Sequence, residues 1–210
     1  MNLNINYEET KLILASKSAR RREILSNAGF VFDILEAKSE LDIIGKKYNK
    51  DLVVNCAKGK AKSVYDFLIE QKSFQNDFKN VIIISSDTIV VSQNEIIGKP
   101  KNREDAHSII SKLSGTTHFV ETAICILKYE LKNPKSFKLL CESDKTYVTF
   151  RKLNDGEIYK YIDEYPPYDK SGSYGIQDGG NDFVIKVEGD MDTVIGFSMK
   201  VFKKLINKVL

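Results

Sequence analysis

Apolar and polar positions follow one another along the first half of the chain in blocks that predict alternating strands and helices. Residues 12–15, in the stretch LILASKSARRREIL, predict a buried strand, and residues 19–28 predict a helix closed by Gly29. Helical spacing of apolar residues between Asp51 and Gln71 predicts a long amphipathic helix. The run VIIISS from Val81 is typical of a buried strand, and TIVVSQNEIIG of a hairpin that follows it.

The second half of the chain repeats this alternation. Asn102 is placed to cap a helix, and FVETAICILKY and FKLLCESDKTYVTFRKL predict two paired strands. Asn154 and Glu157 predict a capping box at the start of another helix. After the glycine-punctuated stretch DKSGSYGIQDGGND come the strand FVIKVEG and a last amphipathic helix. This order of elements predicts an α/β fold with a mixed sheet.

Composition limits the classes of function. The 210 residues are 42% hydrophobic, enough for a sizeable core, and no linker divides residues 1–210, so we expect one domain. The net charge of +3 is too balanced for the broad basic surface of a protein that binds long nucleic acid. The chain has no apolar stretch of membrane-spanning length, and its first residues do not resemble a signal peptide, so we expect a cytoplasmic protein without a membrane partner.

The three cysteines, Cys56, Cys125 and Cys141, are far apart in sequence and each lies in an apolar pattern. Such positions are typical of core thiols, so we expect all three to be reduced and structural. His107 and His118 are separated from one another and from any cysteine pair. A zinc site or a Ser-His-Asp triad therefore has little support in the sequence.

The turn between the first predicted strand and helix is typical of an anion site. Ser16 lies in this turn, where backbone N–H groups and the positive end of the helix dipole point at one place. Successive helix residues point about 100° apart, so at most two of the three arginines face one ligand. Arg20 and Arg21 are the better placed, and Arg22 is assigned to solvent. A solvated helix face is the alternative, but cations at a helix N-terminus oppose the dipole and thus indicate a bound anion.

Two charged residues stand in apolar surroundings. Asp87 follows the run Val81–Ile84 and is expected at the carboxyl end of a buried strand, where open α/β sheets place ligands. It is either a catalytic or metal-binding carboxylate or a cap for a turn. Lys60 projects from the apolar stripe of the predicted helix and either has an anionic partner or extends to the helix edge. Lys99, just before Pro100, is a weaker candidate for a cleft cation, because the sequence alone favours a solvated loop lysine.

The glycine-rich loop also carries groups suited to a nucleobase. Tyr174 offers a ring for stacking, and Gln177 combines a donor with an acceptor. The alternative is that these glycines only shape turns.

Taken together, these motifs resemble the Maf family of nucleoside triphosphate pyrophosphatases over nearly the whole chain. The matching stretches, in order, are LASKSARRREIL, SSDTIV, GKPKNREDAHSIISKLSGTTHFVETAI, VTFRKLNDGEIYKYI and DKSGSYGIQDGG. The resemblance implies a mixed central sheet flanked by helices, with two intimate lobes and a cleft between them, as in the related inosine triphosphatases. It also implies hydrolysis of a nucleoside triphosphate to the monophosphate and pyrophosphate with a divalent cation, magnesium or manganese. A homodimer is suggested by the resemblance alone.

The resemblance also implies roles for individual residues. Asp87 corresponds to the catalytic carboxylate and a metal contact, and Glu40 to a further metal or water contact. Phosphate-contacting positions correspond to Ser16, Arg20, Arg21, Lys60 and Lys99. Arg20, Thr88 and Gln177 match the subgroup that acts on dTTP and UTP, in which Gln177 reads the pyrimidine edge and Thr88 lines its pocket.

The chain departs from the family pattern at two positions. Ala19 stands where proline is usual, and Asp178 stands where a glycine is usual, which adds negative charge beside the predicted base pocket. Asp178 therefore leaves open a 7-methyl-GTP or other non-canonical substrate. Two further alternatives are an enzyme for deaminated purine nucleotides and a non-enzymatic nucleotide-binding regulator of cell division.

Overall fold

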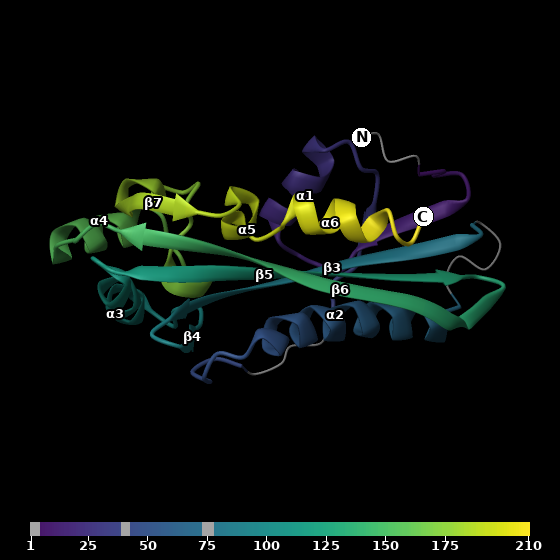
Figure 1. Cartoon of the computed structure of the whole chain (residues 1–210), viewed down its shortest axis with the longest axis horizontal. Helices are drawn as coiled ribbons and strands as arrows, with labels where there is room; N and C mark the ends of the chain where they lie inside the picture. Colours follow the sequence, from purple (N-terminus) through teal and green to yellow (C-terminus); the bar gives the residue numbers. More distant parts are fainter. Residues whose placement is uncertain (1–4, 39–42, 73–77) are drawn as a thin grey trace.

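One mixed sheet runs along the molecule in the computed structural model, which describes residues 5–38, 43–72 and 78–210 (Figure 1). In those residues the strands are β1 (Thr10–Leu14), β2 (Asp33–Ile34), β3 (Asn80–Ser92), β4 (Glu95–Ile97), β5 (Thr117–Glu130), β6 (Asn133–Phe150) and β7 (Val184–Glu188). The helices are α1 (Ala19–Asn27), α2 (Lys50–Glu70), α3 (Arg103–Leu113), α4 (Asp155–Glu164), α5 (Met191–Ile195) and α6 (Met199–Ile206), with 3-10 turns η1 (Ser171–Ser173) and η2 (Gly180–Phe183). The predicted α/β class with a mixed sheet is confirmed.

The sheet changes character along β3. The strand order is β2-β1-β3-β5-β6-β7, with β4 attached to β3 as a hairpin. β1 pairs with β2 and β3 in parallel, whereas β3, β5, β6 and β7 pair antiparallel. The β1–β3 pairing ends at Leu14 and Ile84, but β3 continues for eight more residues beside β5. The sheet therefore has an open edge on β3 just past the end of β1.

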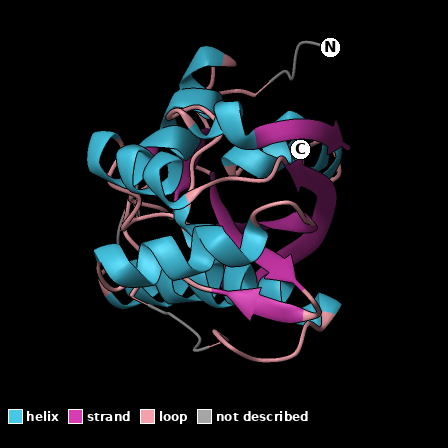
Figure 2. Cartoon of the chain, turned by 90° about the vertical axis from the view of Figure 1, so that its left-hand side faces the viewer, coloured by secondary structure: helices cyan, strands magenta, loops and turns pink. Residues whose placement is uncertain are grey.

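Helices cover both faces of the sheet. α2 lies on one face, and α1 and α6 lie on the other (Figure 1). Separate clusters of buried apolar side chains fill these two interfaces. A third cluster joins the far ends of β5 and β6 to α3 and α4. Figure 2 views this end of the molecule and shows the helices packed around the twisted strands. Among the described helices, none combines the length and apolar character that crossing a membrane requires.

The predicted helix boundaries rest on caps that are present in the structure. The Asn102 side chain accepts a hydrogen bond from the Asp105 amide at the start of α3. Asn154 and Glu157 form the reciprocal capping box of α4. Gly29 and Gly115 follow α1 and α3 with φ of +82° and +68°, a backbone region that favours glycine. The short helix α5 was not predicted, because five residues are too few for a readable helical period.

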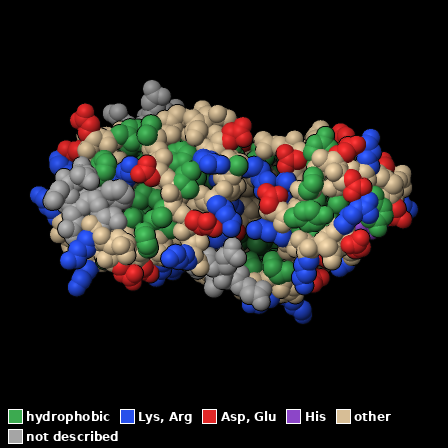
Figure 3. Space-filling view, turned by 180° about the vertical axis from the view of Figure 1, so that it is seen from behind, with side chains coloured by type: hydrophobic (Ala, Val, Ile, Leu, Met, Phe, Trp, Pro, Cys, Tyr) green, Lys and Arg blue, Asp and Glu red, His purple; other side chains and the backbone are tan. Residues whose placement is uncertain are grey.

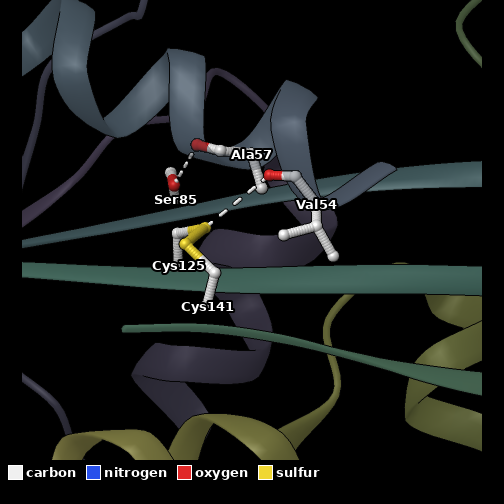
Figure 4. Close-up of a disulfide and its surroundings, with 5 residues drawn as sticks. All are labelled: Val54, Ala57, Ser85, Cys125 and Cys141. Atoms are coloured by element: carbon white, nitrogen blue, oxygen red, sulfur yellow. Dashed lines mark hydrogen bonds between the residues drawn. A yellow bond between two sulfur atoms is a disulfide. The ribbon is translucent and has the colours of Figure 1, made fainter. Parts of the chain in front are cut away.

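The expectation that all three cysteines are reduced is wrong for two of them. Cys125 on β5 and Cys141 on β6 are directly opposed in the antiparallel pair, with Cα atoms 4.1 Å apart, and form a disulfide (Figure 4). Their separation of 16 residues conceals this contact, because it depends on the register of the β5–β6 hairpin. Cys56 is buried and free, as predicted.

Candidate active site

A cleft of about 460 Å³ opens between the two ends of the molecule, beside the edge of β3 that β1 leaves open. Figure 3 shows this hollow near the middle of the long axis, with Lys and Arg side chains gathered beside Asp and Glu. The volume is in the range of small-molecule sites. Every predicted site residue within the described part of the chain lines this cleft: Ser16, Arg20, Arg21, Lys60, Asp87, Thr88, Lys99 and Gln177.

At its centre the cleft holds an ion pair between Lys60 and Asp87. Lys60 Nζ lies 3.1 Å from Asp87 Oδ2, and both side chains are about one-fifth exposed, at 18% and 22%. The other carboxylate oxygen, Oδ1, accepts a hydrogen bond from the Thr88 amide at 2.9 Å. Of the two interpretations of Lys60, the anionic partner is therefore correct, and the helix-edge alternative is wrong. The pair leaves a carboxylate and an ammonium together at the cleft surface.

Asp87 does not end its strand, contrary to the prediction. β3 continues to Ser92, and Asp87 pairs with Ala123 of β5 in mid-strand. The run Val81–Ile84 only marks where β3 is buried between β1 and β5. Asp87 is instead just beyond the end of the neighbouring strand β1, so the expected placement at a carboxyl edge holds for β1 and not for β3.

A thiol also approaches the central carboxylate. Cys56 lies four residues before Lys60 on α2, so the two side chains share one face of the helix. Burial raises the pKa of the Cys56 thiol to about 11, and the negative charge and hydrogen bonding of Asp87 add to this shift. The thiol therefore stays protonated at neutral pH. The four-residue spacing of Cys56 from Lys60 is the signal of this contact in the sequence.

Arg21 joins three segments behind the carboxylate. Its Nε donates to the carbonyl of Gly196 at 2.9 Å. Nη1 donates to Ser16 Oγ at 3.3 Å and to the carbonyl of Ser86 at 2.9 Å, and Nη2 donates to Thr88 Oγ1 at 3.1 Å. Burial lowers the pKa of the guanidinium, while the nearby Asp87 charge opposes this shift. Four of its five N–H donors are thus used within the protein, and Arg21 fixes the positions of its neighbours.

Arg20 is held differently, although it is the next residue along α1. Its Nη1 contacts Asp169 Oδ2 at 3.1 Å across the cleft, and its side chain is 29% exposed. Arg22 is exposed, as predicted. Lys99 is exposed at the cleft rim. Arg20 from α1 and Lys99 from the segment after β4 therefore line the cleft that holds the central pair.

The loop of residues 169–178 forms the opposite wall. Gly172 and Ser173 both have positive φ, of 76° and 60°, and the Gly172 amide donates to the Gly98 carbonyl at 3.0 Å. A Cβ atom on Gly172 would lie 2.9 Å from Val90 Cγ2, so glycine allows the loop to approach β3. Gln177 is exposed at the cleft.

Tyr174 of this loop is held by a buried contact with His118. His118 Nε2 and Tyr174 Oη are 2.8 Å apart, and both residues are buried. Burial lowers the pKa of His118 to about 4, so the ring is neutral at pH 7. His118 is at the start of β5, and its contact with a residue 56 positions away left no signal in the sequence.

The donor groups at the cleft fit a divalent cation that is shared with phosphate. Mg²⁺ is usually bound by one or two carboxylates together with phosphate and water oxygens. Asp87 supplies one carboxylate, and Glu36 lines the same cleft. In residues 5–38, 43–72 and 78–210, no group of three or more His, Cys, Asp or Glu side chains forms a metal cage. Glu40, the other predicted metal contact, lies outside the described residues.

The fold and the cleft define an α/β protein whose site combines a central carboxylate, Asp87, with several cations, an arrangement suited to a polyphosphate anion. The chain belongs to the Maf family, since the family model described as Maf-like protein matches residues 11–209. The resemblance predicted from the sequence motifs is therefore confirmed.

Several relatives are similar over nearly their whole length. The dTTP/UTP pyrophosphatase of Flavobacterium johnsoniae is 40% identical, with 99% of this chain and 100% of the relative covered. Proteins of the same name from Thermoanaerobacter sp. (strain X514) and Bdellovibrio bacteriovorus are 39% and 37% identical. Those alignments cover 89% and 94% of this chain, and 90% and 97% of the relatives. A solved dITP/XTP pyrophosphatase from Mycobacterium abscessus is 9% identical with a TM-score of 0.41 over 94% of each chain, too remote to support a conclusion.

Proposed function

We propose that the protein hydrolyses the pyrimidine nucleoside triphosphates dTTP and UTP to the monophosphate and pyrophosphate. The observation that carries the proposal is the Lys60–Asp87 pair, 3.1 Å apart in a cleft lined by further cations. Its support is twofold: the site chemistry suits a triphosphate, and relatives 37–40% identical are named dTTP/UTP pyrophosphatase.

In the proposed reaction a water oxygen attacks the α-phosphorus, and the bond from that phosphorus to the bridging oxygen of the β-phosphate breaks. Asp87 orients the water and takes its proton, and pyrophosphate leaves with the bonding electron pair. A carboxylate oxygen has two lone pairs, so Asp87 can accept from water while it keeps its contacts with Thr88 and Lys60. Proton removal by a positioned base is worth about 10²–10⁴-fold in rate.

The remaining charges stabilise the polyphosphate. Arg20, Lys60 and Lys99 come from different segments of the cleft wall, and together they neutralise the developing negative charge. Ser16 is placed to contact a phosphate oxygen, while Arg21 holds Ser16 and Thr88 in place. Asp87, together with phosphate oxygens, would hold a magnesium or manganese ion, which would supply further charge neutralisation when bound.

The loop wall is assigned to the base. Gln177 has a donor and an acceptor on one side chain, which matches the acceptor and donor of the uracil or thymine edge. Thr88 Oγ1 is held between Arg21 and Thr122, at 3.1 and 2.9 Å, and presents its side of β3 to the pocket. On this proposal, Gln177→Glu redistributes turnover among nucleotides without abolishing it. An unchanged substrate profile in that variant contradicts the role of Gln177.

The decisive experiment compares Asp87→Asn with Asp66→Asn, a matched change at an exposed position of α2. Purified proteins are incubated with each canonical triphosphate, ITP and 7-methyl-GTP in the presence of magnesium, and pyrophosphate release is measured. We expect Asp87→Asn to lower kcat about 10³-fold while the folded structure is retained, because the exchange is nearly isosteric. Turnover like that of the wild type in Asp87→Asn contradicts the proposed base.

The same panel separates the alternatives. Selective release from ITP supports a purine-directed enzyme, and selective release from 7-methyl-GTP supports the other subgroup. Binding without release from any nucleotide supports a regulator. The cytoplasmic location and the homodimer stay predictions, the second to be checked by sedimentation.

A further inference from the structure

Beside Gln177 lies a lysine that joins two carboxylates. Lys170 Nζ is 2.9 Å from Asp169 Oδ1 and 3.2 Å from Asp178 Oδ2. The Lys170 side chain is only 11% exposed, whereas those of Asp169 and Asp178 are 65% and 40% exposed. All three residues line the cleft. The negative charge that Asp178 brings to the pocket is therefore compensated within the loop.

The backbone of the loop fixes the direction of this contact. The amides of Asp178 and Gly180 both donate to the Gly175 carbonyl at 3.0 Å, which makes a tight turn around Gln177. A Cβ atom on Gly175 would lie 2.6 Å from Asp178 Oδ2 and 2.8 Å from Lys170 Cε. The ion pair is thus seated directly against the Gly175 backbone, and a side chain there would displace it.

A carboxylate beside Gln177, the residue assigned to the base, affects which base is selected. Uracil and thymine present the O4 acceptor at the position where cytosine presents its N4 amino donor. An ionised carboxylate only accepts hydrogen bonds, so it repels O4 and attracts the cytosine amino group. A carboxamide such as Gln177 has both functions. The orientation of Asp178 therefore decides whether the pocket contains an acceptor that favours cytosine.

We propose that Lys170 is a specificity-determining residue that holds the Asp178 carboxylate away from the base and thereby disfavours cytosine nucleotides. Lys170 acts through Asp178 and is a positioning residue. The inference rests on the proposed function, since it concerns how the same cleft chooses among pyrimidine triphosphates.

The test is the ratio of kcat/KM for CTP to that for UTP, measured in the wild type, Lys170→Met, Asp178→Asn and the double variant. Methionine keeps the length of the side chain but removes its charge. We expect the ratio to rise about tenfold in Lys170→Met, as for a hydrogen bond gained by one base and lost by the other. In the double variant the ratio returns to the wild-type value, because no free carboxylate remains at residue 178. Lys170→Arg, which keeps a cation, retains the wild-type ratio.

Other outcomes overturn the inference. A loss of activity toward CTP and UTP by the same factor in Lys170→Met assigns the lysine a purely structural role. A raised ratio that persists in the double variant assigns the effect to Asp169. If Lys170→Met does not fold, as judged by its thermal midpoint, Lys170→Gln takes its place, and an unchanged ratio there overturns the inference as well.

The two proposals fail in distinguishable ways. Absence of pyrophosphate release from every triphosphate in the wild type contradicts the proposed function. Release from UTP in the wild type, with an unchanged ratio in the Lys170 variants, contradicts only the role of Lys170.

Discussion

The two walls of the cleft hold their charged side chains in place through different kinds of contact. The N-terminal wall comprises residues 15–21 with Lys60 and Asp87, and the loop wall comprises residues 169–178. On the N-terminal wall, Arg21 is fixed largely by backbone carbonyls and hydroxyl groups of β3 and of the segment before α6. On the loop wall, Lys170 is fixed by two carboxylates of its own loop.

This difference implies different tolerance to change. The N-terminal wall is built on β1, β3 and α2, so its groups are held by the same ladders and packing that stabilise the fold. The loop wall depends on ion pairs within the loop and on buried contacts such as that of Tyr174 with His118. We therefore expect substitutions in the N-terminal wall to affect turnover, and substitutions in the loop wall to affect substrate choice and local stability.

The largest effect is expected where the N-terminal wall loses its central cation. Lys60→Met leaves Asp87 partly buried without its partner and, on the proposed function, removes a charge that faces the phosphates. We expect kcat/KM to fall about 1,000-fold, roughly 4 kcal/mol. The control is Lys62→Met, at an exposed position of the same helix. Steady-state kinetics check this, and a loss of similar size in both variants contradicts the assignment.

Acid is predicted to lower the stability of the loop wall, because buried His118, which contacts Tyr174 of this loop, is neutral in the folded protein. The folded-state pKa of His118, about 4, lies below the usual value of 6.5, so the unfolded chain binds a proton first as pH falls. The stability that neutral His118 contributes is complete above pH 6.5 and is lost as pH falls toward 4, by about 3 kcal/mol in total.

Urea unfolding at several pH values measures this contribution. We expect His118→Gln to flatten the dependence of the unfolding free energy on pH over this window. The wild type, measured over the same pH values, serves as the reference. If the unfolding free energy depends on pH equally in the wild type and in His118→Gln, the buried His118 ring is not the source of the acid destabilisation.

A smaller effect on turnover is expected from Arg21→Lys. An ammonium cannot reproduce four hydrogen bonds that diverge to Ser16, Ser86, Thr88 and Gly196. Misplacement of Thr88 and its amide contact with Asp87 should lower kcat/KM about 30-fold, roughly 2 kcal/mol, mainly through kcat. Arg22→Lys, at an exposed position of α1, is the control. An effect confined to KM would instead favour a direct phosphate contact for Arg21.

The smallest effect is expected where the two walls meet. Arg20 must exchange Asp169 for a phosphate if it binds substrate, so Asp169→Asn removes a competing carboxylate. Because the pair is partly exposed, we expect KM for the triphosphate to fall only about threefold. Asp163→Asn, which breaks the surface pair with Arg103, is the control. A higher KM in Asp169→Asn would mean that Asp169 orients Arg20 for the ligand.

The sequence allowed the prediction of those features that depend on local pattern. Asp87 and Lys60 stood out because folding alone does not place a charge in an apolar run, and the structure brings the two together. The α/β class followed from alternating periods, and the caps of α3 and α4 from residues three positions apart. Each of these signals is contained within one element of the chain.

The remaining features depend on how distant segments meet. Arg21 bonds to Ser86 and Gly196, which are 65 and 175 positions away, and no local pattern encodes those contacts. The pairing of Cys125 with Cys141 required the strand register. Likewise, the charge of Asp178 was visible in the sequence, but its compensation by Lys170 depends on how the loop folds.

The continuous pairing of β3 with β5 passes beneath the cleft without interruption, from Asn80 opposite Glu130 to Val91 opposite Phe119. This ladder stiffens the sheet, because a sharp bend in it near the cleft would break several backbone hydrogen bonds at once. We therefore expect little relative movement of the two ends of the sheet. We expect ligand entry and release to involve side chains at the cleft rim, and structures with and without nucleotide should superimpose closely along the whole sheet.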